Sequence, residues 1–207
     1  MRMMPLTATL PKAMAPYKGS TLIAQGIAKM AKRIANIHVT VGYKGPVLAQ
    51  HVIEQGASSV FTTEGRSNAW WIYHTLLRHL DEPIYVLTCD NVVELDFDLL
   101  ETNYRKLDSP ACMLVPVRPV AGLEGDYIFH ENQRVTEVDR HKPSDIYCSG
   151  IQILNPSRLN AATRDDGDFY AVWSQLIAQG QLFVSSVYPK EWCVVDTLEQ
   201  LVRLNEE

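Results

Sequence analysis

The sequence predicts an α/β fold with three layers, doubly wound around a mostly parallel, mixed sheet. Three observations lead to this prediction. Helix-like and strand-like patterns alternate through the first two-thirds of the chain. The stretch PIYVLTCDN at 83–91 is a continuous apolar run that stops at an aspartate, as a buried parallel strand would. Two strand patterns flank a polar turn within 127–139, which indicates added antiparallel strands.

The first half of the chain supplies the regular alternation. Ser20 can cap a helix whose apolar residues recur at near-helical spacing from Ile23 to Ile34. The segment SNAWWIYHTLLRHL begins with a capping Ser or Asn and places large apolar side chains on one helix face. The expected elements, in order, are helix 20–34, strand 37–43, helix 47–56, strand 58–63, helix 67–80 and strand 83–91.

The second half adds strands and helices in a less regular order. We find no internal repeat, low-complexity tract or linker, so we expect a single domain over 1–207. The expected elements are helix 96–108, strand 111–117, the hairpin 127–139, strand 148–154, helix 168–180, strand 182–188 and an amphipathic terminal helix 197–207.

Composition and charge narrow the class of protein. The chain has 207 residues, of which 46% are hydrophobic, enough for one globular domain with a full core. Its net charge of −5 provides no broad basic surface for a nucleic-acid backbone. No apolar run approaches the ~20 residues that span a bilayer. We therefore expect a cytoplasmic protein without nucleic-acid or membrane partners. The widely spaced cysteines, which indicate reduced thiols, are Cys89, Cys112, Cys148 and Cys193.

Two aspartates that follow apolar stretches are candidates for a metal site. Asp90 ends the most hydrophobic run, and ligands of open α/β sheets bind beyond the carboxyl ends of strands. Asp196 follows the apolar WCVV and precedes the terminal helix. Carboxylates suit Mg²⁺, which usually takes one or two of them together with phosphate oxygens. The structural alternatives stay open: Asp90 can cap a turn, and Asp196 or Thr197 can be a helix N-cap.

Two lysines in proline-containing loops are candidates for binding phosphate. Lys12 lies in a segment that contains Pro5, Pro11 and Pro16. A lysine on a stiff loop loses less entropy on binding than one on a mobile surface. Lys142 precedes a proline in DRHKPSD, just after the expected hairpin. The alternative for both is an ordinary solvated lysine.

The stretch TEGRSNAWW is a third candidate. Gly65 permits a close approach of the backbone, and Asn68 offers donors and an acceptor at the start of a helix. Free N–H groups at a helix N-terminus bind anions and polar groups. An ordinary loop-to-helix cap explains the same residues equally well.

Six segments stand in the order of the motifs of one enzyme family. They are PLTATLPKAMAPYKGSTLI, VTVGYKG, VLTCDN, RVTEVDRHKP, CSGIQIL and WCVVDTLEQL. Together they resemble the sugar-1-phosphate nucleotidyltransferase family, which includes related cytidylyltransferases and has a Rossmann-like fold. The resemblance covers nearly the whole chain. It implies transfer of a nucleoside monophosphate from an NTP to a sugar 1-phosphate or similar phosphorylated acceptor, with release of pyrophosphate.

The resemblance also implies roles by position. Asp90 and Asp196 would hold Mg²⁺ against the reacting phosphates, and Lys12 would bind the nucleotide phosphates. Lys142 would bind the phosphate of the acceptor. The other implied site residues are Arg2 in the triphosphate-binding loop, Gly65 and Asn68 near the base or ribose, and Ser149 and Gly150 near the acceptor.

The choice of nucleotide rests on two details. The Asp-Thr pair that begins at Asp196 and the S-N-A-W stretch with Asn68 are similar to the branch that resembles choline-phosphate cytidylyltransferases. We therefore expect CTP in preference to GTP, dTTP or UTP. The resemblance leaves the identity of the acceptor and the formation of a homo-oligomer open.

The start of the chain departs from the family pattern. The family has a buried strand and a Gly-rich G-x-G-T-R loop, and in this register Arg2 falls on the loop's arginine. The sequence holds neither the glycines nor the strand. One hypothesis is an active enzyme whose start lies upstream of Met1. The other is a non-catalytic nucleotide- or partner-binding protein, motivated also by Cys89 and His141 in place of a Gly and a Glu. We expect very low turnover from the 207 residues alone.

Overall fold

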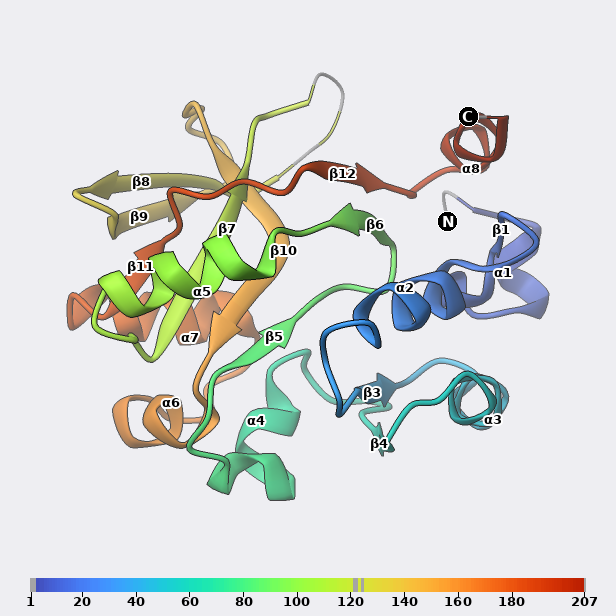
Figure 1. Cartoon of the computed structure of the whole chain (residues 1–207), viewed down its shortest axis with the longest axis horizontal. Coiled ribbons are helices and arrows are strands. Elements are labelled where there is room, and N and C mark those ends of the chain that lie inside the picture. Colours follow the sequence, from blue (N-terminus) through green and yellow to red (C-terminus); the bar gives the residue numbers. More distant parts are fainter. Residues whose placement is uncertain (1–2, 121–122, 124, 207) are drawn as a thin grey trace. The chain divides into compact units, whose positions relative to one another are not determined.

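The computed structural model describes residues 3–120, 123 and 125–206, which form two compact units (Figure 1). The first unit contains the chain up to Arg66, the segment Cys89–Val93 and the chain from Cys193 onward. The second unit contains Ser67–Thr88 and Glu94–Trp192. The expectation of a single domain over 1–207 stays a prediction.

The first unit consists of short helices and small sheets. Its elements are α1 (Leu6–Thr9), the 3-10 turn η1 (Lys12–Met14), β1 (Pro16–Tyr17), β2 (Ser20–Thr21), α2 (Leu22–Met30), β3 (His38–Val41), α3 (Gly45–Glu54), β4 (Ser59–Thr62) and α8 (Leu198–Glu206). Strands β1 and β2 form an antiparallel hairpin, whereas β3 and β4 run parallel. The hydroxyl of Thr21 accepts from the N–H of Ala24 and caps α2, so the cap is Thr21 and the expectation of Ser20 is wrong by one residue.

Two apolar clusters hold the first unit together. One joins α8 to the segment before α2 and includes Val195, which is 0% exposed. The other packs Ile27 of α2 against Val52 of α3, together with Val41 of β3. Burial of such side chains contributes about 1.5–3 kcal/mol each. The clusters therefore fix the short elements that carry the candidate site.

The second unit is built on a six-stranded mixed sheet in the order β5-β10-β7-β11-β9-β8. β11 runs parallel to β7, whereas β10 runs antiparallel to both β5 and β7. The strands are β5 (Ile84–Val86), β7 (Cys112–Val117), β8 (Tyr127–Glu131), β9 (Arg134–Asp139), β10 (Tyr147–Leu154) and β11 (Leu182–Val184). The helices are α4 (Trp70–His74), the 3-10 turn η2 (Leu76–His79), α5 (Phe97–Lys106), α6 (Pro156–Ala162) and α7 (Phe169–Ala178).

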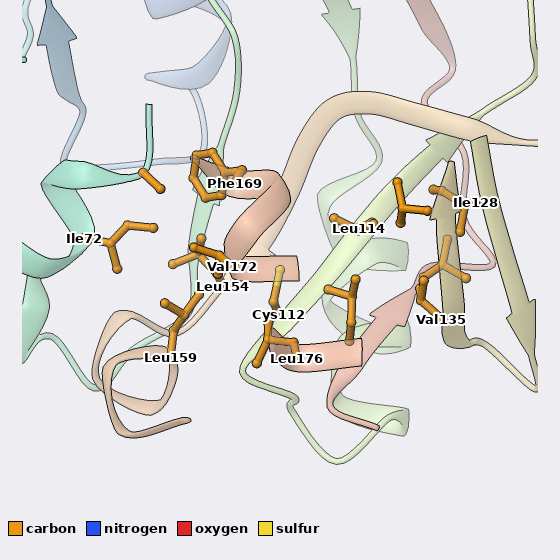
Figure 2. Close-up of a cluster of buried hydrophobic side chains, with 14 of the residues drawn as sticks. Ile72, Cys112, Leu114, Ile128, Val135, Leu154, Leu159, Phe169, Val172 and Leu176 are labelled. Carbon is orange, nitrogen blue, oxygen red and sulfur yellow. The ribbon is translucent and has the colours of Figure 1, made fainter. Parts of the chain in front are cut away.

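An apolar core joins this sheet to its helices (Figure 2). Val172 and Leu176 of α7 belong to the same buried cluster as Leu114 of β7 and Leu154 of β10, and all four are at most 2% exposed. The sequence explains α7 directly, because apolar side chains recur along one face and the carboxylate of Asp168 caps its first turn.

The α/β fold class with a mixed sheet is confirmed, but the sheet has more antiparallel pairings than the sequence indicates. The apolar run 83–91 does not form one long buried strand. Ile84–Val86 forms β5, which lies half-buried at the sheet edge, antiparallel to β10, and only Asn91 at the end of the run belongs to another strand. Short edge strands are common in proteins, because a long unpaired edge can pair with another chain. The hairpin at 127–139 is confirmed.

Two helical expectations also change. The expected helix 67–80 divides into α4 and η2 at Thr75, which has an extended backbone and whose hydroxyl accepts from the N–H of Leu77. Helix α6 was not expected from the sequence. It starts with Pro156 after Asn155, whose side chain accepts from the N–H of Arg158. In the part of the chain that the structure describes, no helix is long and apolar enough to cross a membrane.

Candidate active site

Lys12 projects from a short, well-anchored turn in the first unit. The N–H groups of Met14 and Ala15 donate to the carbonyls of Pro11 and Lys12, at 2.9 and 3.0 Å. Ala15 is 0% exposed in one apolar cluster, and Ala13 is 3% exposed in the other. Movement of the turn would expose both alanines, so the lysine side chain extends from a fixed base.

Asp90 and Asp196 lie at neighbouring ends of two paired strands. β6 (Asn91–Glu94) begins directly after Asp90, and β12 (Glu191–Val194), its partner, ends shortly before Asp196. The N–H of Val195 donates to the carbonyl of Asp90 at 3.0 Å. Val195 is itself buried, so its side chain and its backbone both hold the two aspartates together.

The ammonium group of Lys12 bridges the two carboxylates. Its Nζ lies 2.8 Å from Oδ2 of Asp90 and 2.6 Å from Oδ1 of Asp196. The three side chains are 29%, 28% and 32% exposed, so the cluster is half-buried and open to solvent. The convergence of the two strand-end aspartates, which the sequence alone does not show, is thus a property of the fold.

The charges of this cluster balance only in part. Burial lowers the pKa of Lys12, but the hydrogen bonds to Asp196 and Asp90 and the attraction of both carboxylates outweigh that effect, so the pKa is raised above 10.5. The lysine therefore stays charged at neutral pH. The cluster retains one excess negative charge, which attracts a further cation.

The two carboxylates offer oxygen ligands of the kind that hard divalent cations prefer. Their oxygens already hold one cation, the ammonium group, between them. Within residues 3–120, 123 and 125–206, no three His, Cys, Asp or Glu side chains are grouped as metal ligands. Two carboxylates suit Mg²⁺, which usually completes its coordination with water and substrate phosphates. Asp90 and Asp196 therefore fit a divalent cation whose other ligands are water and phosphate oxygens.

Gly65 belongs to the same unit as this cluster. It is exposed, has a φ of 70° and lies in a turn in which the N–H of Arg66 donates to the carbonyl of Thr63. A Cβ at this glycine would meet open space, so backbone conformation alone explains the residue.

Asn68 lies in the second unit. Its side-chain oxygen accepts from the N–H of Phe169, at 3.0 Å, and so ties the chain before α4 to the start of α7. This hydrogen bond gives the side-chain carbonyl of Asn68 a structural role, which is similar to the helix cap that the sequence also allows. It joins two segments and does not cap α4, whose N-cap is Ala69.

Ser149 and Gly150 form a bulge in β10. The register against β7 shifts between Cys148 and Ile151, and Gly150 has a φ of 79°. The Ser149 hydroxyl donates to the carbonyl of Val115 and accepts from the N–H of Ile151. Ser149 is only 2% exposed, so its hydroxyl serves the bulge.

Lys142 is held in a turn of the second unit. Its Nζ lies 2.6 Å from Oε2 of Glu137 and 4.2 Å from the ring centre of Phe129. The N–H groups of Lys142 and His141 both donate to Oδ1 of Asp139, at 2.6 Å. These backbone bonds lower the pKa of Asp139 below 3.8. Lys142 is therefore an exposed, oriented cation with an acidic partner.

Arg2, expected in a phosphate-binding loop, lies outside the described residues. Gln200 was not expected, although a signal for it exists: Thr197 and Gln200 have the T-x-x-Q spacing of a capping box. Of the two helix caps that the sequence allows here, Asp196 and Thr197, the structure shows Thr197. Its hydroxyl accepts from the N–H of Gln200.

Comparisons with known proteins agree with the resemblance seen in the six segments. No family model matches the sequence. The chain is 26% identical over 171 residues to mannose-1-phosphate guanyltransferases of Debaryomyces hansenii and Candida albicans. Each match covers 75% of this chain and 47% of the relative. The chain thus spans about half the length of these curated relatives.

Solved structures confirm the fold. The inositol-1-phosphate CTP transferase of T. maritima matches with a TM-score of 0.78 and 13% identity, over 99% of this chain and 89% of that one. A protein described as a glucose-1-phosphate thymidylyltransferase from Bacillus anthracis matches with a TM-score of 0.76 and 15% identity, over 99% of this chain and 89% of that one. A CTP:phosphocholine cytidylyltransferase from Streptococcus pneumoniae gives 0.74 at 16% identity, over 100% and 93%. The chain has the α/β fold of these nucleotidyltransferases.

Proposed function

We propose that this chain carries the activity of a nucleotidyltransferase, which moves a nucleoside monophosphate from an NTP to a sugar 1-phosphate or similar phosphorylated acceptor and releases pyrophosphate. The observation that carries the proposal is the convergence of Lys12, Asp90 and Asp196, brought together from the two ends and the middle of the sequence. The curated relatives, named as mannose-1-phosphate guanyltransferases, support the same reaction class.

The cluster has the groups that such a transfer needs. Little covalent chemistry by the protein is required, because positioning and charge neutralisation carry most of the catalysis in phosphoryl-group chemistry. Asp90 and Asp196 would hold Mg²⁺, which when bound neutralises charge on the reacting phosphates. Lys12, fixed on its 3-10 turn, would bind and orient the nucleotide phosphates.

The other residues are assigned to parts of the substrates by their places in the family's sequence motifs. Lys142 would bind the acceptor phosphate, Gly65 and Asn68 would lie near the base or ribose, and Gly150 near the acceptor. Ser149 would lie near the acceptor with its backbone available for contact, because its hydroxyl is already hydrogen-bonded within the bulge. A cytoplasmic location belongs to the same proposal, and homo-oligomer formation stays open.

The nucleotide is the least constrained part of the proposal. The Asp-Thr pair and the S-N-A-W stretch favour CTP, and two of the similar structures are described as CTP-using enzymes. The curated relatives are named for guanyl transfer. A comparison of the rates of product formation with CTP and with GTP therefore decides between cytidylyl and guanylyl transfer.

The test uses the purified 207-residue chain at high concentration in long incubations. Each of CTP, GTP, UTP and dTTP is combined with Mg²⁺ and with sugar 1-phosphates, inositol phosphate or phosphocholine, and products are detected by mass spectrometry. We expect slow formation of one diphosphate-linked product, strongest with CTP. Nucleotide binding without product would favour the non-catalytic alternative. Absence of both binding and product at millimolar nucleotide would contradict the proposal.

A further inference from the structure

Asp196 is held at its backbone by a side chain from the following helix. Oε1 of Gln200 accepts from the N–H of Asp196 at 2.7 Å and from the N–H of Thr197 at 3.0 Å. The Thr197 hydroxyl accepts from the N–H of Gln200 at 3.1 Å. Thr197 and Gln200 thus form a reciprocal capping box at the start of α8. The bond to Asp196 is additional to that motif.

This additional bond holds Asp196 from the segment that follows it in the chain, where the pairing of β6 with β12 does not reach. On the preceding side, the N–H of Val195 donates to the carbonyl of Asp90, which links the two aspartates. On the following side, Gln200 binds the N–H of Asp196 itself. Two consecutive N–H groups, those of Val195 and Asp196, are therefore held by different parts of the first unit.

We propose that Gln200 is a positioning residue that fixes the backbone of Asp196 so that its carboxylate meets Asp90 around a shared cation. The inference rests on the proposed function only for the identity of that cation. In the structure the shared cation is the ammonium group of Lys12, and in the proposed reaction it is Mg²⁺. Gln200 acts through Asp196, whose N–H it binds.

Positioning matters because a site made of two carboxylates tolerates little change in the orientation of either one. Groups that orient a metal ligand typically change metal affinity about 10- to 100-fold when they are removed. Asp196 lies between a strand and a helix, and without Gln200 its own N–H loses its partner. The carboxylate would then sample orientations that point away from Asp90.

Three variants separate positioning from simple helix capping. Gln200→Leu removes the acceptor with little change in volume, and Gln200→Glu keeps an acceptor oxygen. Thr197→Val is the matched control, because it removes the other half of the capping box and leaves the bond from Asp196 to Gln200 in place. Thermal unfolding of each variant reports the loss of stability that capping alone causes.

The first measurement is the affinity for Mn²⁺, used as the probe cation and followed by the electron paramagnetic resonance signal of free Mn²⁺. We expect Gln200→Leu to weaken binding about tenfold, in line with other groups that orient metal ligands. Gln200→Glu should restore it, and Thr197→Val should bind like the wild type even where it melts earlier. Equal losses in Gln200→Leu and Thr197→Val, or no loss in Gln200→Leu, would overturn the proposal.

The second measurement needs no metal. The ¹⁵N ammonium signal of Lys12 reports its ion pairs with Asp90 and Asp196 in the metal-free chain. Gln200→Leu should broaden this signal, whereas Gln200→Glu and Thr197→Val should preserve it; an unchanged signal in Gln200→Leu would overturn the proposal. If Asp196→Asn leaves Mn²⁺ affinity unchanged, the proposed metal role of Asp196 fails, and the ammonium signal still decides the role of Gln200.

Discussion

Nζ of Lys12 lies 2.6 Å from Oδ1 of Asp196, although 184 positions separate the two residues in the chain. The same ammonium group lies 2.8 Å from Asp90, so one internal cation occupies the space between two carboxylates. We expect a divalent cation that binds these two oxygens to displace the ammonium group. Lys12 would then be available to a phosphate, and metal binding and nucleotide binding would be linked.

Lys12→Met should therefore have opposite effects on the two ligands. Without nucleotide, Mn²⁺ should bind more tightly, on the order of tenfold, because its internal competitor is gone. Nucleotide should bind more weakly, because the cation that meets its phosphates is lost. Calorimetric titration with Mn²⁺ and then with CTP measures both. Lys32→Met, the same change at an exposed position, is the control, and a parallel change in both affinities would contradict the account.

Asp90→Asn should abolish most divalent-cation binding with little loss of stability. The change removes one of two negative charges, whereas the half-exposed ion pair that it breaks is worth only about 0.2–1 kcal/mol. We expect Mn²⁺ affinity to fall at least about tenfold, as for lost metal-orienting groups. The exposed Asp166 offers the matched change Asp166→Asn, which should leave Mn²⁺ binding as it is. Equal affinities in the two variants would exclude Asp90 from the site.

The sequence predicts the types of element well because each depends on local pattern. The hairpin at 127–139 and the helix around Leu176 follow from alternation and from helical spacing. The run 83–91 misleads because an apolar strand of the interior and one at a sheet edge have similar composition. What distinguishes them is the number of neighbouring strands, and only the tertiary fold sets that number.

The sequence singles out Lys12, Asp90 and Asp196, but their meeting is not predictable from it, and the roles of these residues stay predictions. Asp90 and Asp196 stand out because each follows an apolar stretch. Their meeting depends on the pairing of β6 with β12 and on the bond from Val195 to Asp90, which no local pattern encodes. The engagement of the Ser149 hydroxyl is likewise a consequence of a bulge in β10 that the sequence shows only as a glycine.

The core of the second unit can be tested separately from the site. Leu176 of α7 is 0% exposed within the buried cluster shown in Figure 2. Leu176→Ala should lower the free energy of unfolding by about 2–5 kcal/mol, because it removes buried methyl groups and leaves a cavity. Leu99→Ala, at a position 54% exposed, should change it by less than about 1 kcal/mol. Urea denaturation followed by circular dichroism gives both values, and similar losses would contradict this packing.

The turn that carries Lys142 should respond to acid. The N–H groups of Lys142 and His141 stabilise the charged form of Asp139 and lower its pKa below 3.8. A lowered carboxyl pKa adds stability above pH 3.8, and this contribution is lost as the pH falls through the folded-state value. The difference in stability between wild type and Asp139→Asn should therefore be constant at neutral pH and shrink below pH 3.8. A ¹³C titration of the Asp139 carboxyl group checks the direction, and a pKa above 3.8 would refute it.

If Asp90 and Asp196 act as the proposed metal site, nucleotidyl transfer depends on both carboxylates. The rate of product formation from CTP, Mg²⁺ and the best phosphorylated acceptor is measured by mass spectrometry for wild type, Asp90→Asn, Asp196→Asn and Asp166→Asn. We expect slow product formation by wild type and Asp166→Asn and none above background by Asp90→Asn and Asp196→Asn. Equal rates in all four proteins would contradict that expectation.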